Sequence, residues 1–313
     1  MRQQYKSMLL LMFLILVWGV NWPLSKFALQ YTPPVLFAGL RALIGGLILV
    51  IAALPRYKQL RFRQNWPIYL LSALLSIVLY YGVQTIGLQY TPAGLFSAIV
   101  FLQPVLLGLF SWWWLGESMT RQKMLGLLIG FAGVATMSAG GLTGSISPIG
   151  IILAIVTALT WALGTVYVKK IGHKVDSLWL TAMQITIGGV ILLAAGSGME
   201  DWSAIVWDPS FIADTVFIAI FVIALGWFVY FKLIHEGEAS KVGSYTFLIP
   251  LVSIATSVLF LDEHVSLNLL IGLILILGSI ILVNVRFRKG KDTPAAQAVT
   301  SSDGVSEAAC RNL

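Results

Sequence analysis

The feature that most constrains the fold of this chain is a succession of about ten apolar segments of roughly 20 residues, the length that spans a bilayer as a helix. Only 11% of the 313 residues are charged, whereas about a quarter are charged in soluble domains. Because lipid cannot hydrogen-bond an open backbone, each segment must be regular helix. The sequence therefore predicts an all-α polytopic membrane protein with ten transmembrane helices. The predicted spans cover residues 8–30, 34–54, 67–89, 93–115, 122–140, 148–168, 177–197, 211–233, 240–261 and 267–286.

The basic residues predict the orientation of these spans, because cytoplasmic connections are enriched in Lys and Arg. If the N-terminus is cytoplasmic, all 20 lysines and arginines except Lys26 and Arg41 fall in inner connections or in the termini. The longest outer connection, 197–211, is instead acidic. We therefore expect a multi-pass protein of a bacterial-type inner (plasma) membrane with both termini in the cytoplasm. The formal net charge of +7 is explained by topology and requires no nucleic-acid partner.

A weak internal repeat divides the chain into two halves. A shift of 143 residues relates Trp18 to Trp161 and Arg41 to Gln184, and a shift of 146 relates Pro104 to Pro250. Each half contains five spans, an odd number, so the two copies must lie upside down relative to each other. Inverted repeats are common in secondary transporters, where the substrate site lies near mid-membrane at their interface. We expect one five-helix repeat over 8–140, a second over 148–286, and a central cavity between them.

Residues 287–313 are polar and rich in small residues, which predicts a disordered cytoplasmic tail. The only cysteine, Cys310, lies in this tail, so a disulfide framework or a cysteine metal site is excluded. The three histidines lie apart at segment ends, and no glycine-rich phosphate loop or Ser/His/Asp set is visible. We expect no catalytic residues, no metal and no cofactor.

Arg41 and Lys26 are the candidates for recognising an anion inside the bundle. Arg41 lies about 10 Å from the outer end of the second span, where a buried charge is costly and usually has a partner. Its guanidinium could anchor a carboxylate or phosphate of a substrate, or it could snorkel to the surface or bond backbone carbonyls. Lys26 lies nearer the membrane surface, and for it snorkelling is the preferred interpretation.

Polar and aromatic residues at similar depths suggest a mid-membrane chamber with aromatic walls. The alternative is that each of them only joins neighbouring helices. No Asp or Glu falls in mid-span, which weighs against a proton-coupled relay of buried carboxylates. The candidate substrate-binding residues, besides Arg41 and Lys26, are Trp18, Asn21, Tyr81, Gln84, Gln103, Trp161, Gln184, Trp227, Tyr230 and Tyr245.

Three prolines predict breaks in the spans, because proline removes one helical hydrogen bond. Pro23 opens the first span, and Pro104 and Pro250 occupy matched positions in the fourth and ninth, so we expect a paired hinge or gating role. The alternative is a purely architectural kink. Glu117 and Glu263 close the fourth and ninth spans at opposite faces and could form gating contacts or be solvated end charges.

The motifs WGVNWPLSKFAL and FAGLRALIGG, together with the block TPAGLFSAIVFLQPVLLGLFSWWWLGESMTRQKMLGLLIGFAGV and its weaker echo EGEASKVGSYTFLIPLVSIATSVLFLDEHVSLNLLIGLILILGSI, resemble EamA-type members of the drug/metabolite transporter (DMT) superfamily. The resemblance covers about residues 8–286. It implies ten helices, two inverted units and a central cavity opened alternately to either side. Relatives export amino acids and other metabolites, or carry sugars and phosphorylated compounds. Gln184, which replaces the second arginine, departs from a symmetric two-arginine site.

We therefore expect a secondary, alternating-access transporter, with export of a small carboxylate-bearing metabolite such as an amino acid as the preferred activity. Arg41 would hold the carboxylate, and aromatic residues would receive the side chain. One alternative is a carrier of the same fold for a drug, a sugar or a nucleotide sugar. Another is a non-transporting membrane enzyme or scaffold. The expected partners are a small-molecule substrate and the lipid bilayer; the coupling ion is left open, and a monomer is the working assumption.

Overall fold

The computed structural model describes residues 2–90, 96, 99–139, 147–252, 256 and 267–284. The predicted gating residue Glu263 and the predicted tail at 287–313 lie outside these residues. All regular elements in the described ranges are helices, and no strand is present in them, which confirms the predicted helical fold. The helices are α1 (Arg2–Ala28), α2 (Pro34–Ala53), η1 (Leu54–Gln59), α3 (Phe62–Ala73), η2 (Leu74–Val78), α4 (Leu79–Tyr90), α6 (Gln103–Leu115), α7 (Arg121–Ala139), α8 (Pro148–Ile171), α9 (Ser177–Met199), η3 (Trp202–Ala204), α10 (Pro209–Phe217), η4 (Ile218–Gly226), α11 (Trp227–Glu236), α12 (Ala239–Tyr245), η5 (Thr246–Leu248) and α14 (Leu267–Asn284).

Six helical stretches in the described residues are long and apolar enough to cross a membrane. They are residues 7–28, 34–59, 62–90, 148–171, 177–199 and 209–236. The other four predicted spans contain α6, α7, α12 with η5, and α14, whose apolar part Leu270–Asn284 is shorter. Six of the ten predicted spans are thus present at full length, and the count of ten remains an expectation for the rest.

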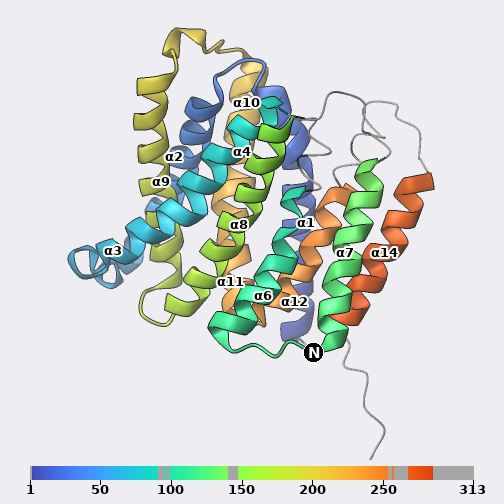
Figure 1. The fold of residues 1–313 in the computed structure, drawn as a ribbon. Helices are drawn as coiled ribbons and strands as arrows, with labels where there is room; N and C mark the ends of the chain where they lie inside the picture. The colour runs from blue at the N-terminus through green and yellow to red at the C-terminus, as the bar shows by residue number, and fades with distance from the viewer. Residues whose placement is uncertain are drawn as a thin grey trace, which may run out of the picture.

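The helices form a bundle in which successive members run up and down (Figure 1). The N-terminus and the α6–α7 connection lie at the same end, which we call the N-terminal face. Three helices that start at the opposite face begin with proline, which suits the first turn because its N–H would be unpaired there: Pro34, Pro148 and Pro209. Asp176 and Asp208 cap α9 and α10 by accepting hydrogen bonds from backbone N–H groups.

Glycines bring repeat-related helices into contact with each other. A Cβ on Gly46 of α2 would lie 2.6 Å from the backbone nitrogen of Thr186 in α9, and a Cβ on Gly189 of α9 would lie 2.5 Å from that of Leu43 in α2. The shift of 143 converts the first pair into the second, since 46 becomes 189 and 43 becomes 186. This reciprocal contact is what a two-fold axis between α2 and α9 requires.

Reciprocal glycine contacts are also found between α7 and α14, which lie side by side at one edge of the bundle (Figure 1). A Cβ on Gly126 would lie 3.2 Å from the carbonyl oxygen of Ser279, and a Cβ on Gly133 would lie 2.9 Å from that of Gly272. A shift of 146 relates these two contacts. The pairs α2–α9 and α7–α14 therefore share one pseudo-symmetry.

The spans 62–90 and 209–236 each contain a stretch of wide π-helix, at Leu74–Val78 and Ile218–Gly226. When 146 is added to its residue numbers, the first stretch falls inside the second. Such stretches rearrange the regular backbone hydrogen bonds and are frequent at functional sites. In the second stretch the carbonyl oxygen of Val222 accepts a hydrogen bond of 3.1 Å from the indole of Trp18.

Candidate functional site

Six aromatic side chains from both halves of the chain pack together in the centre of the bundle. We call this cluster the aromatic cage; it consists of Trp18 (α1), Tyr80 and Tyr81 (α4), Trp161 (α8), and Trp227 and Tyr230 (α11). Trp18 makes ring contacts with Trp161, Trp227 and Tyr230, at centroid distances of 5.6, 5.2 and 5.1 Å. All six side chains are buried. The predicted aromatic walls are thus brought together from four helices.

Repeat-related residues meet directly inside the cage. Trp18 contacts Trp161, its counterpart at a shift of 143. The indole N–H of Trp227 donates a hydrogen bond of 2.7 Å to the hydroxyl of Tyr81, its counterpart at a shift of 146. Two related residues can touch only where the pseudo-symmetry axis passes between them. The cage therefore lies on the axis that relates the two halves.

The cavity inside the cage is small. It offers about 20 Å³ to the centre of a water-sized sphere, which is room for about one water molecule. An amino acid or a larger metabolite does not fit, so this conformation is closed around the cage. The lining residues are Trp18, Asn21, Trp22, Tyr80, Tyr81, Phe101, Trp161, Val222, Trp227 and Ile249.

Arg41 is fully buried next to the cage. Its guanidinium carbon lies 4.6 Å from the ring centroids of both Phe37 and Tyr81, and its Nη1 donates a hydrogen bond of 2.8 Å to Ser25. Ser25 in turn donates to the Oδ1 of Asn21, which lines the cavity. The Nε and Nη2 of Arg41 have no hydrogen-bond partner among the described residues. Arg41 thus carries unused donors beside a buried chamber.

The three predicted glutamines are all buried. Gln103 donates a long hydrogen bond of 3.4 Å from Nε2 to the hydroxyl of Tyr230, which is also bonded to Thr165 at 3.2 Å. The side-chain amides of Gln84 and Gln184 have no partner among the described residues. Both amides can therefore donate and accept hydrogen bonds toward a further group.

Some predicted site residues lie elsewhere. Lys26 is exposed near the end of α1, and Tyr245 faces a groove that it shares with α1 residues such as Met8 and Leu11. Pro23 lies inside α1, whereas Pro104 lies at the start of α6, after a turn at 101–102. Pro250 follows the 3-10 turn η5, so the ninth span is also irregular before its proline.

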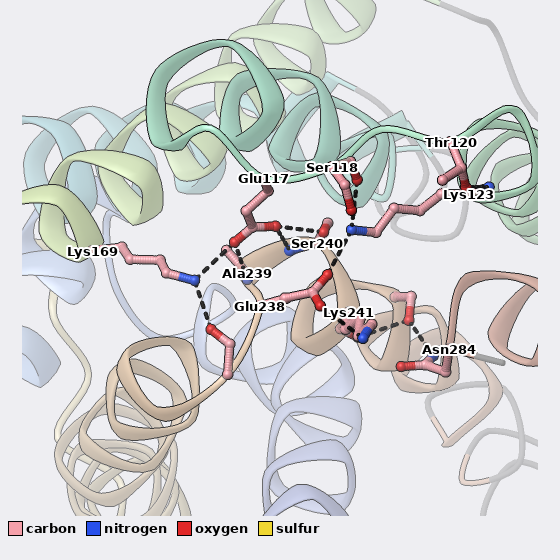
Figure 2. A network of polar contacts seen from close by, with 12 residues as sticks. Glu117, Ser118, Thr120, Lys123, Lys169, Glu238, Ala239, Ser240, Lys241 and Asn284 are labelled. Carbon is pink, nitrogen blue, oxygen red and sulfur yellow. Dashed lines mark hydrogen bonds and ion pairs between the residues drawn. The ribbon is translucent and has the colours of Figure 1, made fainter. Parts of the chain in front are cut away.

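Glu117 joins the two halves of the chain at the N-terminal face (Figure 2). Its carboxylate accepts hydrogen bonds from the backbone N–H groups of Ala239 and Ser240, at 2.6 and 3.2 Å, and from the hydroxyl of Ser240 at 2.6 Å. Lys169 at the end of α8 adds an ion pair of 2.8 Å and donates to the carbonyl of Gly237. Glu117 therefore caps α12 of the other half.

A second carboxylate extends this contact. Glu238 accepts ion pairs of 2.8 Å from both Lys123 in α7 and Lys241 in α12 (Figure 2). Lys123 also donates to the carbonyl of Ser118. We call the set formed by Glu117, Lys123, Lys169, Glu238, Ala239 and Ser240 the N-face network.

The surroundings keep both carboxylates of this network ionised. Burial alone would raise the pKa of Glu117, but hydrogen bonds from Lys169 and Ser240 outweigh it and hold the pKa below its ordinary value. Burial also opposes ionisation of Glu238, yet hydrogen bonds from Lys123 and Lys241 lower its pKa to about 2. Both groups are therefore charged at neutral pH.

Two groups of polar residues around the site were not predicted from the sequence. Ser25 and Asp214 are buried, and Ser25 bonds Arg41 while the charge of Asp214 acts on it; across the N-terminal face, Lys169 pairs with Glu117 and Glu238 pairs with Lys123. Asp214 lies only a few residues inside the predicted span 211–233, so a search for charges near span ends would have found it. The pairing of Lys169 with Glu117 had no signal in the sequence, because connections far apart in the chain supply the two groups.

Equivalent residues of two repeats meet around one buried chamber in membrane transporters, and that is the class of protein to which this arrangement points. Two consecutive matches to one family model identify the family. The chain belongs to the EamA-like transporter family, which residues 5–139 match once and residues 148–285 match again. The family resemblance seen in the motifs is thereby confirmed.

Similarity to individual proteins supports this family assignment. The "Uncharacterized transporter YvbV" of Bacillus subtilis (strain 168) is 62% identical over 286 residues, which cover 91% of this chain and 94% of that protein. A "Probable amino-acid metabolite efflux pump" of Escherichia coli (strain K12) is 25% identical, over 91% of this chain and 97% of the pump. A solved structure with 21% identity shares the fold, with a TM-score of 0.76 over 89% of this chain and 97% of that chain. This chain is accordingly a multi-pass membrane protein of a transporter family.

Proposed function

We propose that this transporter exports an α-amino acid or a similar small carboxylate-bearing metabolite by alternating access. The observation that carries the proposal is Arg41, a fully buried guanidinium beside the aromatic cage, two of whose donor groups have no partner among the described residues. Guanidinium binds carboxylate through two parallel hydrogen bonds, and the apolar cage rings would receive the side chain. The "amino-acid metabolite efflux pump" among the relatives supports this cargo class.

The proposed site lies on the axis between the halves, where both halves can change their contacts together. The N-face network joins Glu117 of the first half to Ala239 and Ser240 of the second. We propose that this network breaks when the site opens toward the N-terminal face, and that this face is cytoplasmic, as the positive inner connections predict. Pro104 and Pro250, which follow irregular turns, would act as the hinges.

Counterflow into proteoliposomes tests the cargo. Vesicles loaded with each of the twenty amino acids, with organic acids and with sugars would be assayed for uptake of the matching labelled compound. We expect at least one amino acid to exchange. Exchange confined to sugars, or no exchange of any compound by folded protein, would contradict the proposal.

Arg41→Gln and Arg41→Lys test the anchor. Because hydrogen bonds to charged groups contribute about 1.5–3 kcal/mol, we expect Arg41→Gln to weaken cargo affinity about 10- to 100-fold. Arg41→Lys should be intermediate, since lysine keeps the charge but loses the fork. The matched control is Arg63→Gln, which removes an exposed arginine. Unchanged affinity in folded Arg41→Gln would show that Arg41 is only structural.

A further inference from the structure

Asp214 of α10 is a buried carboxylate that the proposed carboxylate anchor does not use. Its residue is only 7% exposed, and neither of its carboxylate oxygens has a hydrogen-bond partner among the described residues. The hydroxyl of the next residue, Thr215, is also buried and unpartnered in the described part of the chain. A bare carboxylate in such a place is expensive, and either a bound proton or a cationic partner removes that cost.

Arg41 and Asp214 lie at the same depth on neighbouring helices. Both α2 and the α10–α11 span run from the opposite face toward the N-terminal face (Figure 1). The helices touch at Gly45, where a Cβ would lie 2.7 Å from the carbonyl oxygen of Ala219. Arg41 precedes Gly45 by four residues and Asp214 precedes Ala219 by five, which correspond to rises of about 6 Å and about 7.5 Å along the two helices.

The two charges act on each other without forming an ion pair. Asp214 and Arg41 attract each other electrostatically, yet no ion pair or hydrogen bond joins them, and Nε and Nη2 of Arg41 remain unused. A direct pair would be the simplest way to stabilise two opposite buried charges. A ligand that carries both a carboxylate and an ammonium could bind between the two side chains and compensate both charges.

We propose that Arg41 and Asp214 are the two poles of a site for the head group of a zwitterionic α-amino acid. Arg41 binds the carboxylate and Asp214 accepts hydrogen bonds from the ammonium. Thr215 lies next to the ammonium position, and the Ser25–Asn21 bond links the head-group site to the cage, which receives the side chain. This assignment rests on the proposed function and narrows its cargo from carboxylates to amino acids.

Three matched ligands and two charge-neutral variants test the assignment. The ligands are the amino acid that exchanges fastest in counterflow, its des-amino carboxylate and its decarboxylated amine; for leucine the analogues are 4-methylpentanoate and 3-methylbutylamine. Binding would be measured by calorimetry on the full chain in lipid nanodiscs, for the parent, Asp214→Asn and Arg41→Gln. The control Asp208→Asn removes a partly exposed carboxylate that caps the same helix, and asparagine caps equally well.

We expect the parent to bind the amino acid at least about tenfold more tightly than either analogue. Asp214→Asn should weaken the amino acid and the amine about 10- to 100-fold and leave the carboxylate within about twofold, and Arg41→Gln should weaken the amino acid and the carboxylate but not the amine. Asp208→Asn should bind all three as the parent does. Asp214→Glu should keep the preference for the ammonium.

Several outcomes would overturn the assignment. Asp214→Asn could weaken the amino acid and its des-amino carboxylate equally, could weaken neither, or could change only the pH dependence of binding, which would make Asp214 a protonation site. If Asp214→Asn does not fold, equal binding of amino acid and carboxylate by the parent overturns it. A parent that exchanges no amino acid defeats the proposed function as well, whereas an effect of Arg41→Gln without one of Asp214→Asn defeats only this inference.

Discussion

At the scale of single residues, the fold buries the charged side chain of Arg41 inside a span, at a cost in free energy. An arginine near the centre of a span costs about 2.5–3.5 kcal/mol on insertion scales. Arg41 recovers part of this through cation–π contacts with Phe37 and Tyr81 and one hydrogen bond to Ser25. Two of its donor groups, Nε and Nη2, have no partner in the part of the chain that the structure describes. A purely structural arginine is expected to use all its donors, and for this reason we propose Arg41 as a ligand anchor.

Gly189 lies at the close crossing of α9 with α2, where a larger residue has no room. Its substitution by alanine would place a Cβ 2.5 Å from the backbone nitrogen of Leu43, so α2 and α9 must move apart. Because overpacking costs about 1–3 kcal/mol, we expect Gly189→Ala to lower the thermal unfolding midpoint of the detergent-solubilised protein.

Gly198→Ala is the matched control for this change. Gly198 lies on the same helix, and a Cβ there meets nothing within 4 Å, so alanine should be neutral or slightly stabilising. Equal unfolding midpoints for Gly189→Ala and Gly198→Ala would contradict the close α2–α9 crossing.

The sequence identified Arg41 as a buried cation because charges are rare inside spans. It could not identify Asp214 as its neighbour, because the distance between α2 and α10 depends on Gly45 packing against Ala219. Lys26 could be separated from Arg41 in the sequence, because it lies nearer the end of its span, and its side chain is exposed in the structure.

At the scale of elements, the N-face network holds α12 against the α6–α7 connection. Glu117 accepts three hydrogen bonds from Ala239 and Ser240 in addition to its ion pair with Lys169. Removing its carboxylate leaves the first N–H groups of α12 without their cap. The network should therefore depend more on Glu117 than on any of its lysines.

Glu117→Ala should open the N-terminal face. In a Cys310→Ser background, we expect the buried reporter Val242→Cys to react about 10- to 100-fold faster with a water-soluble thiol reagent when Glu117 is replaced, because hydrogen bonds to a charged group contribute about 1.5–3 kcal/mol. The matched control is Glu236→Ala, an exposed glutamate in the preceding helix. Equal reactivity in Glu117→Ala and the parent would rule out a closing role.

The same reporter tests the pH range of the network. The pKa values of Glu117 and Glu238 are lowered in the folded protein, that of Glu238 from 4.5 to about 2. Their stabilising contribution is therefore complete above the unfolded pKa and is lost as pH falls through the folded one. Relative to an exposed cysteine at Ser118, the reactivity of Val242→Cys should stay constant from about pH 6 to pH 8. A rise across that range would contradict the assigned charges.

Six spans follow from length and apolarity alone, which is why the sequence located them well. The fourth and ninth are harder, because they are broken next to Pro104 and Pro250: α6 begins only at Gln103, and η5 precedes Pro250. The prolines predicted a break but not its form. A proline removes one hydrogen bond, and the packing around it decides whether the backbone bends, turns or tightens.

At the scale of the whole molecule, the two halves meet through equivalent residues. Trp18 contacts Trp161, Tyr81 bonds Trp227, and the glycine contacts of α2–α9 and α7–α14 are reciprocal. The shifts of 143 and 146 were visible in the sequence, but the contacts were not, because a repeat does not reveal where its axis runs. The closed cage also could not be foreseen, since a cavity exists only as the gap that packing leaves.

A pseudo-symmetric molecule closed at its centre has two equivalent ways to open. Under the proposed mechanism, the network at the N-terminal face breaks for one of them and the halves rock about the cage. In the closed arrangement, the cage has room for about one water molecule. Alternating access therefore requires that the cage become open to each side of the membrane in turn.

Two cysteines on α8 test this claim most directly. Thr157 and Thr165 are buried, and each lies about one helical turn, or 5.4 Å, from Trp161 of the cage, on opposite sides of it. In the Cys310→Ser background, Thr157→Cys and Thr165→Cys would be exposed to a membrane-impermeant thiol reagent from either side of oriented vesicles. Alternating access predicts that the reagent reaches Thr157→Cys only from one side and Thr165→Cys only from the other, and that transported cargo slows both reactions. Labelling of both from the same side, or of neither from any side, would contradict it.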